Sequence, residues 1–137
     1  MSKQIYSFGK KQGYIRNATS TFYDGMVYRS KKEAGYAQHL DILMKADDRK
    51  DKVFRWEYEP HLEVTCNNKK VFTYKIDFKV EYCDGRIEYV EIKGFETAYW
   101  RLKFKVVEAV NNGYEDSKGG AVFNLNIEPF SELIIVK

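Results

Sequence analysis

The sequence predicts one mixed α/β domain with the element order helix, three strands, helix, strand. Its 137 residues, of which 44% are hydrophobic, suit a single globular core. Apolar and polar residues alternate along the middle of the chain, as they do in strands, and a helix-start signal stands on each side of that region. We therefore expect a mixed sheet with helices packed against it.

The first helix is expected over residues 30–46, after the turn signal Asp24-Gly25. Ser30 is a suitable N-cap, and Glu33 follows it at the spacing of a capping box. Residues 47–52 are all charged, which predicts an exposed loop after the helix.

Three strand segments follow, over residues 54–66 with an interruption near Pro60, then 71–82, then 86–93. In the second segment every other residue is apolar, which is the period of a strand with one buried face. Asp84-Gly85 links the second and third segments, so these two should form a tight antiparallel hairpin.

The second helix is expected from Thr97 to Asn111, with Thr97 as its N-cap and Gly113 just beyond its end. A strand is expected from Ala121 to Ile127, and a short final strand from Glu132 to Val136.

The charges are unevenly distributed. The net charge of +3 does not by itself indicate a nucleic-acid-binding protein. Residues 1–23, however, contain no acid and interleave aromatic residues with the bases Lys3, Lys10, Lys11 and Arg16. Such an arm can neutralise phosphates and stack on bases; alternatively, it is a flexible terminus or a segment exchanged between subunits. Residues 24–137 should form the single domain.

The composition argues against several classes of protein. The chain has no run of about 18 apolar residues and no signal-peptide pattern, so we expect a cytoplasmic protein without a membrane partner. Cys66 and Cys83 form no CxxC pair, and there are only two histidines. A zinc cluster is therefore not expected, and both cysteines should be free thiols.

Glu33 is the first candidate site residue. Helical periodicity places it on one arc with Ala37, Leu40 and Met44, at the end of the face that should meet the sheet. A carboxylate is unexpected there. The alternative is that Glu33 completes the capping box of Ser30.

A second group of candidates lies in the hairpin. Glu91 and Lys93 share one face of their strand with Tyr89. Asp77 converges on Glu91 if the polar face of its own strand turns towards a cleft. Two adjacent carboxylates repel each other unless a hard cation such as Mg²⁺ lies between them, and Lys93 would then position a water molecule or neutralise a phosphate oxygen. The alternative is a cross-strand ion pair on an exposed strand.

Asp77 followed by Glu91-Ile92-Lys93, after a helical glutamate and before a helix, resembles the PD-(D/E)xK nuclease superfamily. Over residues 22–110 the chain also looks like a small phage-associated family labelled DUF1064. The motifs that carry this resemblance are Tyr28–Glu33, Trp56–Glu59, Tyr74–Phe78, Glu91–Gly94, Thr97 and Leu102-Lys103. It implies a restriction-endonuclease-like αβββαβ core, with a central mixed sheet flanked by helices. The proline of the nominal motif is replaced by Ile76.

The resemblance implies a metal-dependent endonuclease that hydrolyses phosphodiester bonds in DNA. Asp77, Glu91 and the backbone carbonyl of Ile92 would bind Mg²⁺ or Mn²⁺, with Lys93 as the catalytic lysine. Glu33, the helical acid, would complete the outer shell of the metal or orient a metal-bound water. It further implies a homodimer that acts on duplex or branched DNA, as a Holliday-junction resolvase does, in phage DNA recombination, replication or packaging.

Candidate DNA contacts are polar residues of the arm and of the two helices. They are Lys10, Lys11, Arg16, Lys31, Thr97, Arg101 and Lys103. The alternatives are a solvated helix face for the bases and an N-cap for Thr97. For the whole protein, the alternative function is a catalytically silent nucleic-acid-binding module of nuclease fold within a larger complex. A protein-binding domain with coincidental charges is the third possibility.

Overall fold

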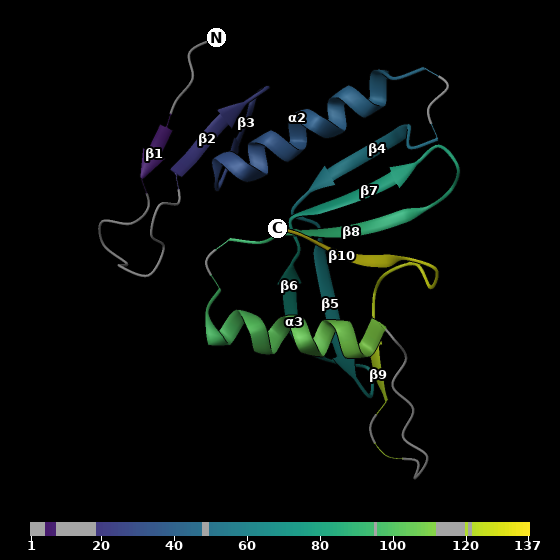
Figure 1. Cartoon of the computed structure of the whole chain (residues 1–137). Coiled ribbons are helices and arrows are strands. Elements are labelled where there is room, and N and C mark those ends of the chain that lie inside the picture. The colour runs from purple at the N-terminus through teal and green to yellow at the C-terminus, as the bar shows by residue number, and fades with distance from the viewer. Residues whose placement is uncertain (1–4, 8–18, 48–49, 95, 112–119, 121) are drawn as a thin grey trace. The chain divides into compact units, whose positions relative to one another are not determined.

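The computed structural model of the chain describes residues 5–7, 19–47, 50–94, 96–111, 120 and 122–137 (Figure 1). The chain divides into two compact units. Unit 1 comprises residues 1–55 and 82–84, and unit 2 comprises residues 56–81 and 85–137. The described residues form two helices together with antiparallel and mixed sheets, which confirms the mixed α/β class.

Unit 1 contains an antiparallel sheet of β1 (Ile5–Ser7), β2 (Thr19–Tyr23) and β3 (Met26–Tyr28). Asp24 and Gly25 join β2 to β3 with φ angles of 47° and 84°, the left-handed conformations that two-residue hairpin turns require. The sequence predicted this turn but not the strands beside it, because they are too short to display a period of two.

The expected N-terminal arm ends at residue 23, which is the last residue of β2. Residues 1–4 and 8–18 lie outside the described residues. Lys3, Lys10, Lys11 and Arg16 are among them, so the arm and its DNA contacts stay predictions.

Helix α2 (Lys31–Lys45) packs against β2 and β3 and confirms the first predicted helix. The backbone N–H of Glu33 donates to Oγ of Ser30 over 3.1 Å, which confirms the N-cap. At the other end, Nζ of Lys52 donates to the carbonyls of Met44 and Ala46, each over 2.7 Å. A cation at this place satisfies carbonyls that the helix leaves unpaired.

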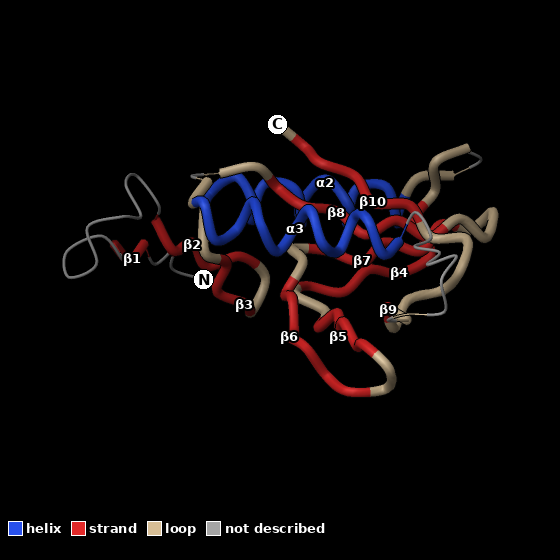
Figure 2. The backbone as a smooth tube through the Cα atoms, turned by 90° about the horizontal axis from the view of Figure 1, so that it is seen from below, coloured by secondary structure: helices blue, strands red, loops and turns tan. Residues whose placement is uncertain are grey.

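Unit 2 contains two sheets and the helix α3 (Ala98–Asn111). The mixed sheet has the order β10 (Glu132–Val136), β8 (Ile87–Ile92), β7 (Phe78–Tyr82) and β4 (Val53–Tyr58), and the last three residues of β4 belong to this unit. The antiparallel sheet has the order β6 (Lys69–Lys75), β5 (His61–Cys66) and β9 (Phe123–Leu125). Figure 2 shows the β5–β6 hairpin running away from β7 and β8.

Most element predictions for unit 2 are confirmed. β7 and β8 form the antiparallel hairpin, and Gly85 adopts a φ of 94° in its turn. The N-cap of α3 is Thr97, whose Oγ1 accepts a hydrogen bond from the Trp100 N–H over 3.0 Å. Gly113 lies outside the described residues. β10 matches its prediction and pairs in parallel with β8, whereas β9 is shorter than the predicted strand 121–127.

The expectation of one continuous strand over residues 71–82 was wrong. The chain leaves the antiparallel sheet at Lys75 and enters the mixed sheet at Phe78. Earlier in the chain, β4 belongs to the mixed sheet and β5 to the antiparallel sheet, so the chain also passes between the two sheets at Glu59-Pro60. The N–H of Glu59 donates to the carbonyl of Asp77 over 2.8 Å, so the two crossings are joined at one corner.

The core of unit 2 lies where α3 packs against the strands. Trp100 and Phe104 of α3 stack with ring centroids 5.3 Å apart. Seven buried residues form the core, namely Leu62, Val64, Tyr74, Ile76, Tyr89, Phe104 and Val107.

The cysteines and the helices bear on two expectations that came from the composition. Cys66 and Cys83 are both free, as predicted. Within the described part of the chain, neither helix has the length and apolar character needed to cross a membrane.

Candidate functional site

The structure brings Asp77 and the Glu91-Ile92 peptide together at the corner between the two sheets. Phe78 pairs with Val90 in the antiparallel register, so Asp77 and Glu91 occupy the next opposed positions. The N–H of Ile92 donates to Oδ2 of Asp77 over 2.6 Å. Each of the two acidic residues is only 5% exposed. Asp77 and Glu91 are therefore opposed across the hairpin and both buried, while the binding of one metal by their two carboxylates stays a prediction.

Glu91 is held by two aromatic side chains from different elements. Its Oε2 accepts a hydrogen bond from the Tyr74 hydroxyl of β6 and another from Nε1 of Trp100 over 2.5 Å. A buried carboxylate needs such donors, because burying a charged group without them costs more than the roughly 1–3 kcal/mol that an unpaired neutral group costs. No described residue donates to its other oxygen, Oε1.

Tyr74 remains a hydrogen-bond donor across the ordinary pH range. Burial raises the pKa of its phenol far above the usual value, and the negative charge of Glu91 and the hydrogen bond to it raise that pKa further. Sequence reasoning missed Tyr74 and Trp100 as site residues. The available signal was that buried tyrosine and tryptophan each need a partner for their one polar atom.

Lys93 lies two residues beyond Glu91 and is half-buried. Its Nζ is 3.6 Å from Oε2 of Glu96, an acid that sequence reasoning did not consider. Both side chains are partly exposed, so this pair contributes little to stability, about 0–1 kcal/mol. The Lys93 N–H donates to the carbonyl of Val136 over 2.7 Å, so β10 fixes the backbone of the motif.

Glu33 belongs to unit 1 and is buried at the start of α2. Its Oε2 accepts a hydrogen bond from the Ser30 hydroxyl over 2.9 Å. Glu33 therefore contacts the N-cap residue through the Ser30 hydroxyl. The capping-box bond from the Ser30 backbone N–H to Glu33, and the role of Glu33 as a third acid of the site, stay predictions.

The candidate DNA contacts differ in their surroundings. Lys31 and Arg101 are exposed, and Thr97 is engaged as the N-cap of α3. Lys103 is half-buried, and its Nζ donates to the carbonyl of Thr73 over 3.3 Å. None of these contacts tests DNA binding, which stays a prediction for all four residues.

The donor set can be compared with what a divalent cation needs. The described residues contain no cluster of three or more His, Cys, Asp or Glu side chains that could hold a metal. Mg²⁺, however, is commonly bound through one or two carboxylates, with water and substrate phosphate as its other ligands. Asp77 and Glu91 therefore fit a Mg²⁺ shared with a phosphate substrate, and not a metal enclosed by protein alone.

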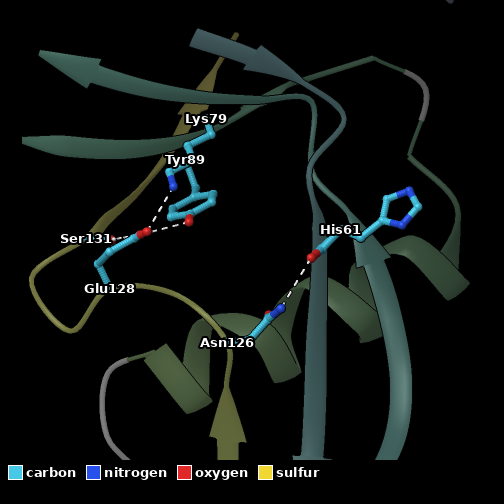
Figure 3. A network of polar contacts seen from close by, with 6 residues as sticks. All are labelled: His61, Lys79, Tyr89, Asn126, Glu128 and Ser131. Carbon is cyan, nitrogen blue, oxygen red and sulfur yellow. Dashed lines mark hydrogen bonds and ion pairs between the residues drawn. The ribbon is translucent and has the colours of Figure 1, made fainter. Parts of the chain in front are cut away.

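A second carboxylate in unit 2, the half-buried Glu128, lies in a cluster of polar contacts (Figure 3). Glu128 accepts hydrogen bonds from Lys79 over 2.9 Å, from Tyr89 over 2.9 Å and from Ser131 over 3.2 Å. Burial alone would raise the pKa of Glu128, but the hydrogen bonds and the charge of Lys79 outweigh it and lower the pKa to about 2. This cluster attaches the segment before β10 to β7 and β8.

We expect Glu128→Gln to lower the Tm at pH 7 by about 3 °C, because the amide cannot pair with the Lys79 ammonium. The folded-state pKa lies below the ordinary value of 4.5, so the stabilisation is complete above pH 4.5 and is lost as the pH falls towards 2. Thermal unfolding of both proteins from pH 7 to pH 2 should show the Tm difference shrinking in that window. A difference independent of pH would contradict this.

The described residues define a small mixed α/β protein with a buried pair of carboxylates at a corner between two sheets. A family model described as "Protein of unknown function (DUF1064)" matches residues 14–125, and the chain belongs to this family. This confirms the DUF1064 part of the resemblance. No curated protein and no solved structure matches the chain significantly.

Proposed function

We propose that the protein is a metal-dependent endonuclease that hydrolyses phosphodiester bonds in DNA. The observation that supports this most directly is the buried pair Asp77 and Glu91, with Lys93 two residues beyond it. Two neighbouring buried carboxylates are unfavourable without a cation, and a divalent cation that both bind relieves their repulsion. Their resemblance to the acidic motif of the PD-(D/E)xK superfamily supports the same proposal.

In this proposal each residue has a distinct task. Asp77 and Glu91 hold Mg²⁺ or Mn²⁺, which when bound acts as a Lewis acid towards the scissile phosphate. The Lys93 ammonium stabilises negative charge that develops on the phosphate oxygens. Tyr74 and Trp100 fix the orientation of the Glu91 carboxylate through its Oε2. Tyr74 and Trp100 are positioning residues, because they act through Glu91.

The resemblance also supports a finer proposal about substrate and context. The enzyme would act as a homodimer on branched DNA, in the manner of a Holliday-junction resolvase, during phage DNA recombination, replication or packaging. A dimer would carry two copies of the site and so cut two strands.

One observation favours a second candidate function. Oε2 of Glu91, one of the two oxygens that could bind a metal, already accepts two hydrogen bonds from protein donors. This arrangement also suits a catalytically silent nucleic-acid-binding module of the same fold.

Incubation with supercoiled plasmid and with a synthetic four-way junction, in Mg²⁺, Mn²⁺ or EDTA, separates the two candidates. We expect cutting that requires the metal and prefers the junction. Lys93→Ala should slow it by about 100-fold, because a charge that stabilises the transition state is removed. DNA binding without cutting in any metal would leave the silent module as the function.

A further inference from the structure

One side of α3 carries a lysine held between two aromatic rings. Nζ of Lys103 lies 5.3 Å from the centroid of the Phe72 ring and 5.1 Å from that of the Tyr99 ring. Lys103 is half-buried, whereas Tyr99 is 69% exposed. We call Phe72, Lys103 and Tyr99 the aromatic platform. A ring so exposed gains little from folding, so its surface is available to a ligand.

The platform and the carboxylate site draw residues from the same two elements, α3 and β6. Tyr99 precedes Trp100, whose indole donates to Glu91. Phe72 lies two residues before Tyr74 and therefore on the same face of β6, and the Tyr74 hydroxyl also donates to Glu91. A ligand on the platform would thus be held next to the carboxylates.

The two elements that carry the platform concentrate positive charge. α3 and β6 together hold six basic residues and one acid, a net charge of +5, whereas the whole chain has +3. The rest of the chain is therefore net negative. This distribution favours a polyanion at α3 and β6 over a neutral or basic partner. The charged residues of β6 and α3 are Lys69, Lys70, Lys75, Arg101, Lys103, Lys105 and Glu108.

We propose that the platform binds an unpaired nucleotide of DNA, with its base stacked on Tyr99 and its phosphate beside Lys103. Bases inside a duplex already stack on each other and present only their edges, so an exposed ring can stack only on a base outside the duplex. The inference rests on the proposed nuclease function and names its substrate class: a duplex joined to a single-stranded segment.

The test measures binding in EDTA, so that it does not depend on cleavage. The full chain is titrated into a fluorescent forked duplex and into a blunt duplex of equal length. We expect tighter binding to the fork, and Tyr99→Ala should weaken that binding about tenfold while leaving the blunt duplex unchanged. Tyr99→Phe keeps the ring and should bind as the wild type does. Leu102→Ala is the matched control, because Leu102 is also exposed, at 63%, on the same helix.

Two further readouts distinguish stacking from general attraction. 2-Aminopurine placed at the unpaired position should lose fluorescence on binding wild type or Tyr99→Phe, but not on binding Tyr99→Ala. Lys103→Met should reduce the slope of log affinity against log salt by about one, because one phosphate contact is lost.

Equal binding of the fork by wild type and Tyr99→Ala would overturn the proposal, as would an equal loss on both DNAs. The outcome is separable from that of the nuclease assay. A Tyr99-dependent preference for the fork, without cutting in any metal, would support the aromatic platform and contradict the nuclease function. If cutting depends on metal but Tyr99→Ala does not change the preference for the fork, the nuclease function is supported and the aromatic platform is contradicted.

Discussion

Asp77→Asn is expected to reduce Mg²⁺-dependent cleavage of plasmid DNA by about 10³-fold, which corresponds to about 4 kcal/mol of transition-state stabilisation. The asparagine amide removes the charge that would hold the metal. Its oxygen can still accept the hydrogen bond from the Ile92 N–H, so the corner between the sheets should keep its shape.

A metal titration by thermal unfolding checks the same change without DNA. Mg²⁺ should raise the Tm of the wild type, because a ligand that binds only the folded state stabilises it. It should leave the Tm of Asp77→Asn unchanged. Glu128→Gln is the matched control: it also exchanges a partly buried carboxylate for an amide in unit 2, but should keep both the response to Mg²⁺ and the cleavage. Full cleavage by Asp77→Asn would exclude this residue as a metal ligand.

Tyr74→Phe should weaken Mg²⁺ binding by about tenfold, because groups that orient a ligand typically contribute 10- to 100-fold to metal affinity or activity. The change removes one of the two hydrogen bonds to Oε2 of Glu91 and leaves the ring in the core. Loss of this bond should also lower the free energy of unfolding by about 1 kcal/mol in EDTA.

The Mg²⁺ concentration at half-maximal cleavage is the decisive measurement for Tyr74→Phe. Tyr89→Phe is its control, because Tyr89 is a buried tyrosine of the same core whose hydroxyl donates to Glu128 instead. Both variants should lose similar stability, and only Tyr74→Phe should need more Mg²⁺. An unchanged or lower requirement in Tyr74→Phe would mean that the phenol does not position Glu91 for metal binding.

Local signals in the sequence predicted the helices and the turns. Ser30 and Thr97 accept backbone hydrogen bonds from residues three positions later, and Gly85 supplies the positive φ of the β7–β8 turn. Each of these interactions depends on a few adjacent residues. Sequence alone could therefore place them.

The corner at Asp77 could not be predicted in the same way. Apolar residues alternate without a break from Phe72 to Tyr82, and that pattern does not reveal that the chain passes from one sheet to another between Lys75 and Phe78. The donors to Glu91 come from residues 17 and 9 positions away, and only packing of α3 and β6 brings them together. Glu91 was predictable because a charged residue is unusual on a strand face that begins with apolar residues, such as Tyr89. Asp77 stands on the polar face of its segment, and its role was predicted from its place in the hairpin and from the resemblance.

The corner also constrains where the length of the chain can change. β7 begins one residue after Asp77, and the carbonyl of Asp77 accepts the hydrogen bond that joins it to the other crossing at Glu59. A one-residue deletion or insertion there would turn each side chain of β7 to the opposite face of its sheet, and the buried Phe78 and Val80 would be the first to be displaced. This stretch should therefore tolerate exchanges of residue type far better than insertions or deletions.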